Sequence, residues 1–169
     1  MAQRQILAFP DERLTLTSQP VTTFDSGLNQ LVEDLFDTLY ATSGIGLCAP
    51  QIGELQQVLV MDLSDDHSAP RVFINPTLLS TATPCMVEES CLSVPDYVSV
   101  VRRYADARVR ACDRHGNEFE QDLTGMEAVC LQHEMDHLDG KLFVERLSYL
   151  KRWYFNATAA GRLRRAANG

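Results

Sequence analysis

Two histidines four residues apart constrain this chain more than any other feature. Residues 133–137 read His-Glu-Met-Asp-His, an H-E-x-x-H motif. Four residues of α-helix rise about 6 Å and turn a little more than once, so His133 and His137 face the same side. Two imidazoles at that spacing can hold one metal ion, and Glu134 lies where it can reach a water molecule beside that ion. The motif therefore predicts a metal-dependent hydrolase site on a helix.

The residues before the motif indicate that this helix is not a solvated surface element. Met126, Val129 and Cys130 precede His133 at the i, i+3, i+4, i+7 spacing of one helix face. A short H-E-x-x-H match can arise by chance on an exposed helix, but an apolar stripe is not typical of a solvent face. We therefore expect a partly buried helix over residues 124–138, ended by the Asp-Gly pair that follows.

Length and composition favour one soluble domain spanning residues 1–169. Apolar residues make up 45% of the 169 residues, as in ordinary globular proteins. No apolar run has the length of a membrane span, and the N-terminus does not resemble a signal peptide, so we expect a cytoplasmic protein without a membrane partner. The five cysteines are an odd set without paired spacing, and we expect most of them to be free thiols.

Charge is distributed unevenly along the chain. Residues 1–140 hold 8 Lys/Arg and 22 Asp/Glu, a net charge of −14, whereas residues 141–169 hold 7 Lys/Arg and one acid, a net charge of +6. A basic tail on an acidic body is either a solvated helix end or a surface that meets an anionic partner such as nucleic acid. Charge alone favours neither alternative.

Hydrophobic periodicity predicts an α+β fold of mostly antiparallel strands around the central H-E-x-x-H helix. A first helix runs from Asp25 or Ser26 to about Ala41, and a basic C-terminal helix covers roughly residues 148–167. Strands are expected at 57–62, 71–75, 97–101, 107–112 and 118–123, the last two forming a hairpin. The strands come mostly without helices between them, which favours antiparallel pairing over a doubly wound parallel sheet.

A catalytic zinc-type site needs three protein ligands and one open position, so a third ligand must be found. No histidine follows His137, and Glu145, the one acid after residue 139, is too close to supply a separate ligand. His67 and His115 lie in polar turns, where we expect them to be exposed. A thiolate remains, and Cys91 lies in a segment shaped by turn residues. A Cys-His-His set suits iron(II), zinc, nickel or cobalt.

Three segments together resemble the peptide deformylase family. Residues 44–51, Gly-Ile-Gly-Leu-Cys-Ala-Pro-Gln, are similar to its G-h-G-L-A-A-x-Q loop. Residues 89–93, Glu-Ser-Cys-Leu-Ser, are similar to its E-G-C-L-S segment, and residues 132–140 are similar to its Q-H-E-x-D-H-L-x-G helix. Their order and spacing also agree, and the resemblance extends over nearly the whole chain.

The resemblance implies removal of the formyl group from N-formylmethionine at the start of nascent polypeptides. It implies one divalent metal ion, usually iron(II) and often replaced by zinc or nickel, bound by Cys91, His133 and His137. Glu134 would be the acid/base. The two groups that would hold the formyl oxygen are the Gln51 side chain and the backbone N–H of Leu92.

The resemblance also implies how the substrate is held. The chain around Gly46 would pair with the substrate backbone as a strand does, and the methionine side chain would enter an apolar pocket. Six residues are expected to line the substrate site: Ile45, Gly46, Val87, Met126, Val129 and Cys130. The basic tail would meet ribosomal RNA through Lys151, Arg152, Arg162, Arg164 and Arg165, and no DNA partner is expected.

Three positions depart from the family pattern. Ser90 stands where the family has Gly, and a serine there would be strained if that position needed a positive φ. Cys48 replaces a family Ala, and Val98 stands where many relatives carry an Arg near the peptide-binding cleft. Two other functions share parts of the pattern. A zincin-type protease would need a downstream ligand, and a non-catalytic metal-stabilised module would need a fourth one.

Overall fold

The computed structural model describes residues 3–166, and its architecture is the predicted α+β fold. The helices and strands are α1 (Ser26–Tyr40), β1 (Gly46–Cys48), β2 (Val58–Met61), β3 (Arg71–Cys91), β4 (Val94–Cys112), β5 (Glu118–Thr124), α2 (Gly125–Leu138) and α3 (Tyr149–Ala166). Three short 3-10 turns add η1 (Glu12–Thr15), η2 (Ala49–Ile52) and η3 (Phe143–Arg146). The strands form one antiparallel sheet in the order β1-β2-β3-β4-β5. No described helix has the length and apolar character needed to cross a bilayer.

Helix α1 forms where the sequence predicts it. The Asp25 carboxylate caps it by accepting hydrogen bonds from the backbone N–H groups of Gly27 at 2.9 Å and Leu28 at 3.0 Å. The predicted apolar stripe is buried against β1, β2 and the start of β3: Leu28, Leu31, Val32, Leu35, Phe36 and Leu39. Near the end of the helix, the Tyr40 hydroxyl donates to the Asp62 carboxylate at 3.0 Å.

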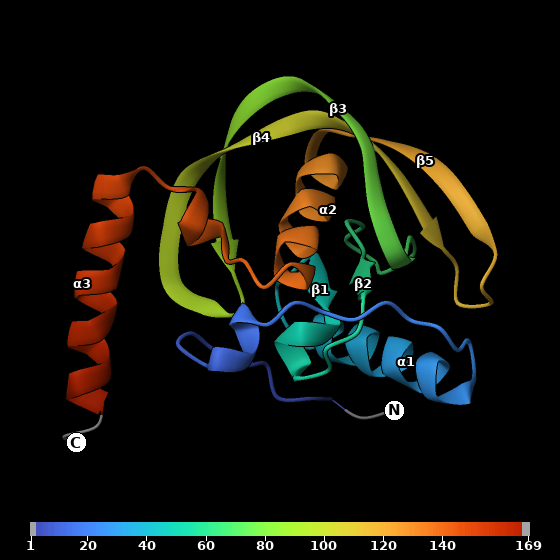
Figure 1. The fold of residues 1–169 in the computed structure, drawn as a ribbon, viewed down its shortest axis with the longest axis horizontal. Coiled ribbons are helices and arrows are strands. Elements are labelled where there is room, and N and C mark those ends of the chain that lie inside the picture. Colours follow the sequence, from blue (N-terminus) through green and yellow to red (C-terminus); the bar gives the residue numbers. More distant parts are fainter. Residues whose placement is uncertain (1–2, 167–169) are drawn as a thin grey trace.

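The sheet is buried on both faces at its centre, which explains the continuous apolar run of β2. Val58 and Val60 point toward α1, whereas Leu59 and Met61 point toward α2. Figure 1 shows α2 lying beneath the arch of β3 and β4, with α1 below it. The H-E-x-x-H helix is therefore central, as predicted.

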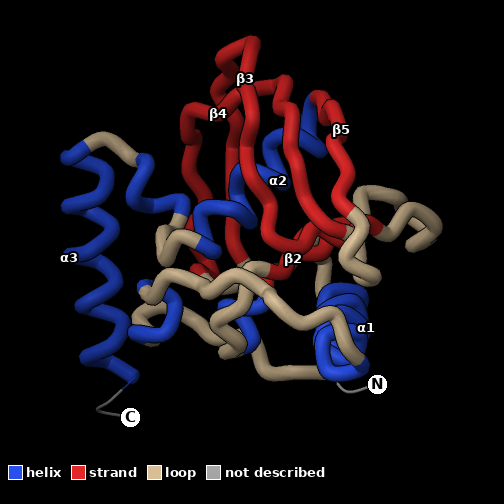
Figure 2. The backbone as a smooth tube through the Cα atoms, turned by 45° about the vertical axis from the view of Figure 1, so that its right-hand side comes forward, coloured by secondary structure: helices blue, strands red, loops and turns tan. Residues whose placement is uncertain are grey.

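Strands β3 and β4 are far longer than the sequence predicts. The expected strands at 97–101 and 107–112 are parts of one strand of 19 residues, and the strand expected at 71–75 extends to Cys91 over 21 residues. Together they form a long curved ribbon, visible in Figure 2. The register shifts near Ile74, Leu78 and Glu89 are irregularities of the bulge type, which bend a ribbon in this way. The hydrophobic pattern does not reveal residues 76–90 because most of them are exposed.

Among the described side chains of helix α3, Phe155 is the one that is buried against the rest of the protein. Phe155 is buried, and its ring lies 5.2 Å from that of Phe9 and 4.8 Å from that of Tyr97. Four other apolar side chains of this helix are exposed: Tyr149, Leu150, Trp153 and Tyr154. Figures 1 and 2 show α3 standing at one side of the molecule.

Candidate active site

Helix α2 carries the predicted histidines and fixes their direction. Gln132, directly before the motif, ties the helix to β4: its amide nitrogen donates to the Tyr104 carbonyl at 2.7 Å, and its amide oxygen accepts from the Tyr104 N–H at 3.1 Å. The rings of His133 and His137 lie 5.1 Å apart, nearly edge to face. His137 is only 1% exposed, and its Nδ1 has no hydrogen-bond partner among the described residues.

Cys91 joins the two histidines from a distant part of the chain. It is the last residue of β3, directly before the tight turn into β4, and its Sγ lies 3.1 Å from His137 Nε2. Cys91, His133 and His137 each offer one ligand atom, and these atoms lie within 4.8 Å of one another. Ligands about 2.0–2.3 Å from a tetrahedral metal lie roughly 3.5 Å apart, so the residues fit one ion. His67 and His115 are exposed, as predicted.

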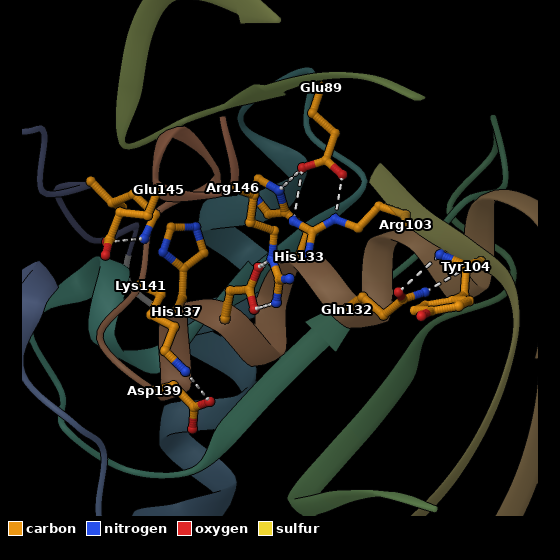
Figure 3. A network of polar contacts seen from close by, with 12 residues as sticks. Glu89, Arg103, Tyr104, Gln132, His133, His137, Asp139, Lys141, Glu145 and Arg146 are labelled. Atoms are coloured by element: carbon orange, nitrogen blue, oxygen red, sulfur yellow. Dashed lines mark hydrogen bonds and ion pairs between the residues drawn. The ribbon is translucent and has the colours of Figure 1, made fainter. Parts of the chain in front are cut away.

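A chain of ion pairs, buried except at Arg146, supports the metal-ligand set (Figure 3). The Glu89 carboxylate accepts from His133 Nδ1 at 2.8 Å and from the Arg103 guanidinium at 2.6 and 3.0 Å. Arg103 also donates to Asp136 at 2.6 Å, and Asp136 accepts from Arg146. Because a carboxylate occupies Nδ1, the tautomer and ring orientation of His133 are fixed, and its other nitrogen is left for a metal.

Electrostatics at the two histidines also suit a bound cation. Burial lowers the pKa of His137 to about 3, so its ring is neutral and has a free lone pair. Burial opposes a charge on His133 too, but contacts with Cys91 and Glu89 raise its pKa to about 10. A site that attracts a proton this strongly favours positive charge, which a metal ion supplies.

Glu134 lies next to the ligand set and is almost inaccessible to solvent. It is 3% exposed, and its Oε2 has no hydrogen-bond partner among the described residues. Burial raises the pKa of this carboxyl, as suits a group that takes up a proton and returns it near neutral pH. A Cβ at Gly46 would lie 2.8 Å from Glu134 Oε1 and 2.7 Å from Cys130 Sγ, so only glycine leaves this space open.

Gln51 is buried with its amide nitrogen directed toward the metal ligands. Its Oε1 accepts from the Cys48 backbone N–H at 3.0 Å and from the Cys48 thiol at 3.2 Å. Its Nε2 therefore faces Cys91 Sγ at 3.8 Å and Ser93 Oγ at 3.2 Å. The Cys48 side chain thus helps to orient Gln51. The similar size of cysteine and the family alanine gives no indication of this role.

A pocket of about 470 Å³ opens beside this cluster. Its lining includes Gln51, Cys91, Leu92, His133 and Glu134, whereas His137 is not part of the lining. The structure also brings all six predicted substrate-site residues into that lining: Ile45, Gly46, Val87, Met126, Val129 and Cys130.

The structure corrects or completes several expectations about single residues. Met126, placed on a buried helix face from its spacing, is 51% exposed, because its side chain lines the open pocket. Ser90 is not strained, since the described non-glycine residues with positive φ are His67, Asn75, Thr83 and Asp96. Val98 is 54% exposed and does not line the pocket. All five cysteines are free, whereas we expected this of most of them.

Sequence reasoning missed the supporting ion pairs. Arg103 is 1% exposed, yet it stands in an Arg-Arg-Tyr stretch that reads as a solvated strand. Glu89 and Asp136 fall inside two of the recognised segments, one next to the metal cysteine and one between the histidines. Their position in those segments could have indicated the ion pairs, because a buried carboxylate there requires a cationic partner.

The fold and the site define a hydrolase of the H-E-x-x-H class. The family model described as polypeptide deformylase matches residues 3–153. Peptide deformylase from Hahella chejuensis is 47% identical over 90% of this chain and 91% of its own length, and peptide deformylase 1 from Pseudomonas syringae pv. tomato is 50% identical over 90% and 91%.

Solved structures agree with these sequence comparisons. A peptide deformylase from Legionella pneumophila superposes with a TM-score of 0.90 at 43% identity and covers 99% of both chains. One from Ehrlichia chaffeensis in complex with actinonin gives 0.89 at 34% identity over 96% and 98%. The chain belongs to the peptide deformylase family. It is a hydrolase that removes the N-formyl group from nascent peptides.

Proposed function

We propose that deformylation proceeds at one divalent ion held by Cys91, His133 and His137, with Glu134 as the acid/base. The observation that carries this proposal is the convergence of one sulfur and two ring nitrogens within 4.8 Å beside a buried carboxylate. Iron(II) is the proposed physiological metal, and zinc or nickel would occupy the same donors in protein purified in air. The proposed place of action is the cytoplasm.

The residues around the ion have complementary tasks. A bound ion supplies Lewis-acid polarisation of the formyl oxygen and lowers the pKa of water. Glu134 takes a proton from the attacking water and later passes it to the leaving amine. Gln51 Nε2 and the Leu92 backbone N–H donate hydrogen bonds to the oxygen that becomes negative. Losing one such donor costs about 3–4 kcal/mol of transition-state stabilisation.

The pocket beside the site accounts for substrate selection. Ile45, Gly46, Val87, Met126, Val129 and Cys130 would surround the methionine side chain and the start of the peptide. β1 is an edge strand of the sheet, and the segment from Gly44 to Gly46 lines the pocket, so a peptide in extended form can pair with it. Glu134 and Cys130 approach Gly46 closely, and this crowding would favour formyl, the smallest acyl group.

The acid/base assignment is tested with Glu134→Ala. This variant should bind metal as the wild type does and lose turnover of formyl-Met-Ala, measured as formate release. The matched control is Glu127→Ala, which removes a partly exposed carboxylate from the same helix, away from the pocket lining. Turnover of Glu134→Ala near the wild-type level would contradict the assignment. Cleavage of internal peptide bonds by the wild type at comparable rates would instead favour a protease.

The ligand assignment is tested with Cys91→Ser on anaerobically purified protein. Metal content should fall well below one ion per chain, because a hydroxyl is a poorer ligand than a thiolate for these metals. Cys85→Ser changes a partly exposed cysteine of the same strand and should leave metal content unchanged. Equal metal content in both variants would exclude Cys91. Elemental analysis of the wild type identifies the ion, and a metal other than iron would refute the iron(II) proposal.

We also propose that α3 meets the ribosome surface, where nascent chains emerge. The sequence of this helix has no acidic residue, its Lys151 and Arg152 are exposed, and its exposed aromatic side chains suit stacking on unpaired bases. Arg162, Arg164 and Arg165 belong to the same proposal, although their side chains lie outside the described part. Truncation after Ser148 should abolish co-sedimentation with ribosomes at low salt, and unchanged co-sedimentation would refute this role.

A further inference from the structure

A second pocket, of about 610 Å³, lies at the surface where β4, the segment after α2 and α3 come together. Four cationic side chains and one carboxylate line it, with one tyrosine: Arg102, Lys141, Arg146, Arg152, Glu145 and Tyr104. It shares no lining residue with the pocket beside the metal ligands. This concentration of positive charge contrasts with a net charge of −8 for the whole chain.

The acidic groups nearby offset only part of the positive charge of this pocket, because Asp136, the partner of Arg146, is shared with Arg103. The Glu145 carboxylate is engaged in the turn of η3, where it accepts the Leu142 backbone N–H at 3.0 Å. Lys141 pairs with Asp139 at 3.1 Å, but both side chains are more than half exposed. Such a surface ion pair contributes little, so a more highly charged anion can take its place.

One of the four cations is held in position by the protein interior. Arg146 donates through Nε and Nη2 to Asp136, and this buried carboxylate is in turn held by Arg103. The guanidinium of Arg146 is therefore oriented before any ligand arrives, which reduces the entropy cost of binding. Asp136 uses two of the five N–H donors of this guanidinium, and the remaining donors on Nη1 and Nη2 form a second planar fork that matches the oxygen atoms of a phosphate group.

We propose that this second pocket binds a phosphate group, coordinated by Arg102, Lys141, Arg146 and Arg152. The same chemistry is offered by an RNA backbone and by a free phosphate ion. If RNA supplies the phosphate group, the pocket extends the proposed ribosome contact from α3 to the body of the protein. In that case the inference rests on the proposed ribosome contact. The pocket itself does not depend on deformylation.

Binding is measured with two probes, inorganic phosphate by calorimetry and a short labelled RNA by fluorescence anisotropy across a salt series. The test variants are Arg102→Ala and the double variant Arg102→Ala/Arg152→Ala, both of exposed side chains outside the catalytic machinery. The matched control is Arg108→Ala, which removes the same charge from the exposed face of the same strand, where Arg108 pairs with Glu120.

The double variant should lose about tenfold in affinity, and the RNA salt dependence should become shallower by about 0.7–0.9 per lost contact. Arg108→Ala should change affinity by less than about twofold, and formate release should be unchanged in every variant. Binding of RNA alone or of phosphate alone identifies the source and supports the pocket. A loss of affinity in Arg102→Ala, in which α3 is intact, would show that the pocket contributes to binding separately from the helix. Failure of both probes to bind, or equal losses in test and control variants, would overturn the proposal.

Discussion

Replacement of Arg103 by methionine probes the ion pairs that support the metal site. Arg103 is buried between Glu89 and Asp136, so its loss leaves two buried carboxylates without their shared cation. Breaking a buried pair in this way costs about 3–5 kcal/mol. Asp136 keeps Arg146 as a partner, which places the expected loss near 3 kcal/mol. For a chain of this length, that loss lowers the melting temperature by about 6–12 °C.

The assay is thermal unfolding of the metal-free protein, followed by circular dichroism, with metal affinity measured separately. Because Glu89 orients His133, metal affinity should also fall by about 10–100-fold. Arg108→Met, which breaks an exposed pair on the same strand, should shift the melting temperature by about 2 °C or less. Adding Glu89→Gln to Arg103→Met should restore part of the stability, because it removes one buried carboxylate that has lost Arg103, without restoring metal affinity.

Melting of Arg103→Met within about 2 °C of the wild type would refute this reasoning, since it would mean that the buried carboxylates do not require Arg103. Equal metal affinity in the two proteins would separately refute the link from Glu89 to His133.

Three further substitutions test local features. Gly46→Ala should lower kcat/KM at least about tenfold in a formate-release assay, because the new methyl group would lie 2.8 Å from Glu134 Oε1, and unchanged kinetics would refute the clash. Cys48→Ala removes the thiol hydrogen bond to Gln51, which is worth about 1 kcal/mol. We therefore expect kcat to fall about fivefold with KM unchanged. Cys48→Ser, which keeps a hydrogen-bond donor, should restore kcat. Burial and the adjacent carboxylate raise the pKa of Tyr40 to about 12, so its contribution to stability is complete below about pH 10 and is lost as pH rises through 12. An alkaline absorbance titration should show one late tyrosine that is missing in Tyr40→Phe.

The sequence predicts best where local periodicity and burial coincide. The α1 stripe from Leu28 to Leu39 is fully buried as expected, and the spacing of His133 and His137 places both rings on one side of α2. Elimination of other donors indicated Cys91, and the structure brings its sulfur to 3.1 Å from His137. The first two features depend on residues close together in the sequence, and the third depends on the small number of other candidate metal ligands.

Features set by contacts between distant parts of the chain were harder to predict from the sequence. The ribbon of β3 and β4 runs far past its apolar segments, because pairing between two long strands does not need a buried side chain at each position. Arg103 gives no sign of burial in its neighbours along the chain, since both of its carboxylate partners arrive from other elements. The exposure of Met126 likewise depends on the open pocket that its side chain lines rather than on helix spacing.

The place of β1 at the margin of the sheet has a consequence for the range of proteins that can be processed. A newly made polypeptide that binds through its backbone amide groups presents the same hydrogen-bonding pattern whatever its later residues are. In the proposed arrangement only the first side chain would meet the pocket, so discrimination would end after the initiating methionine. One catalyst that works in this way would serve an entire proteome, because the rest of each substrate would be recognised as main chain alone.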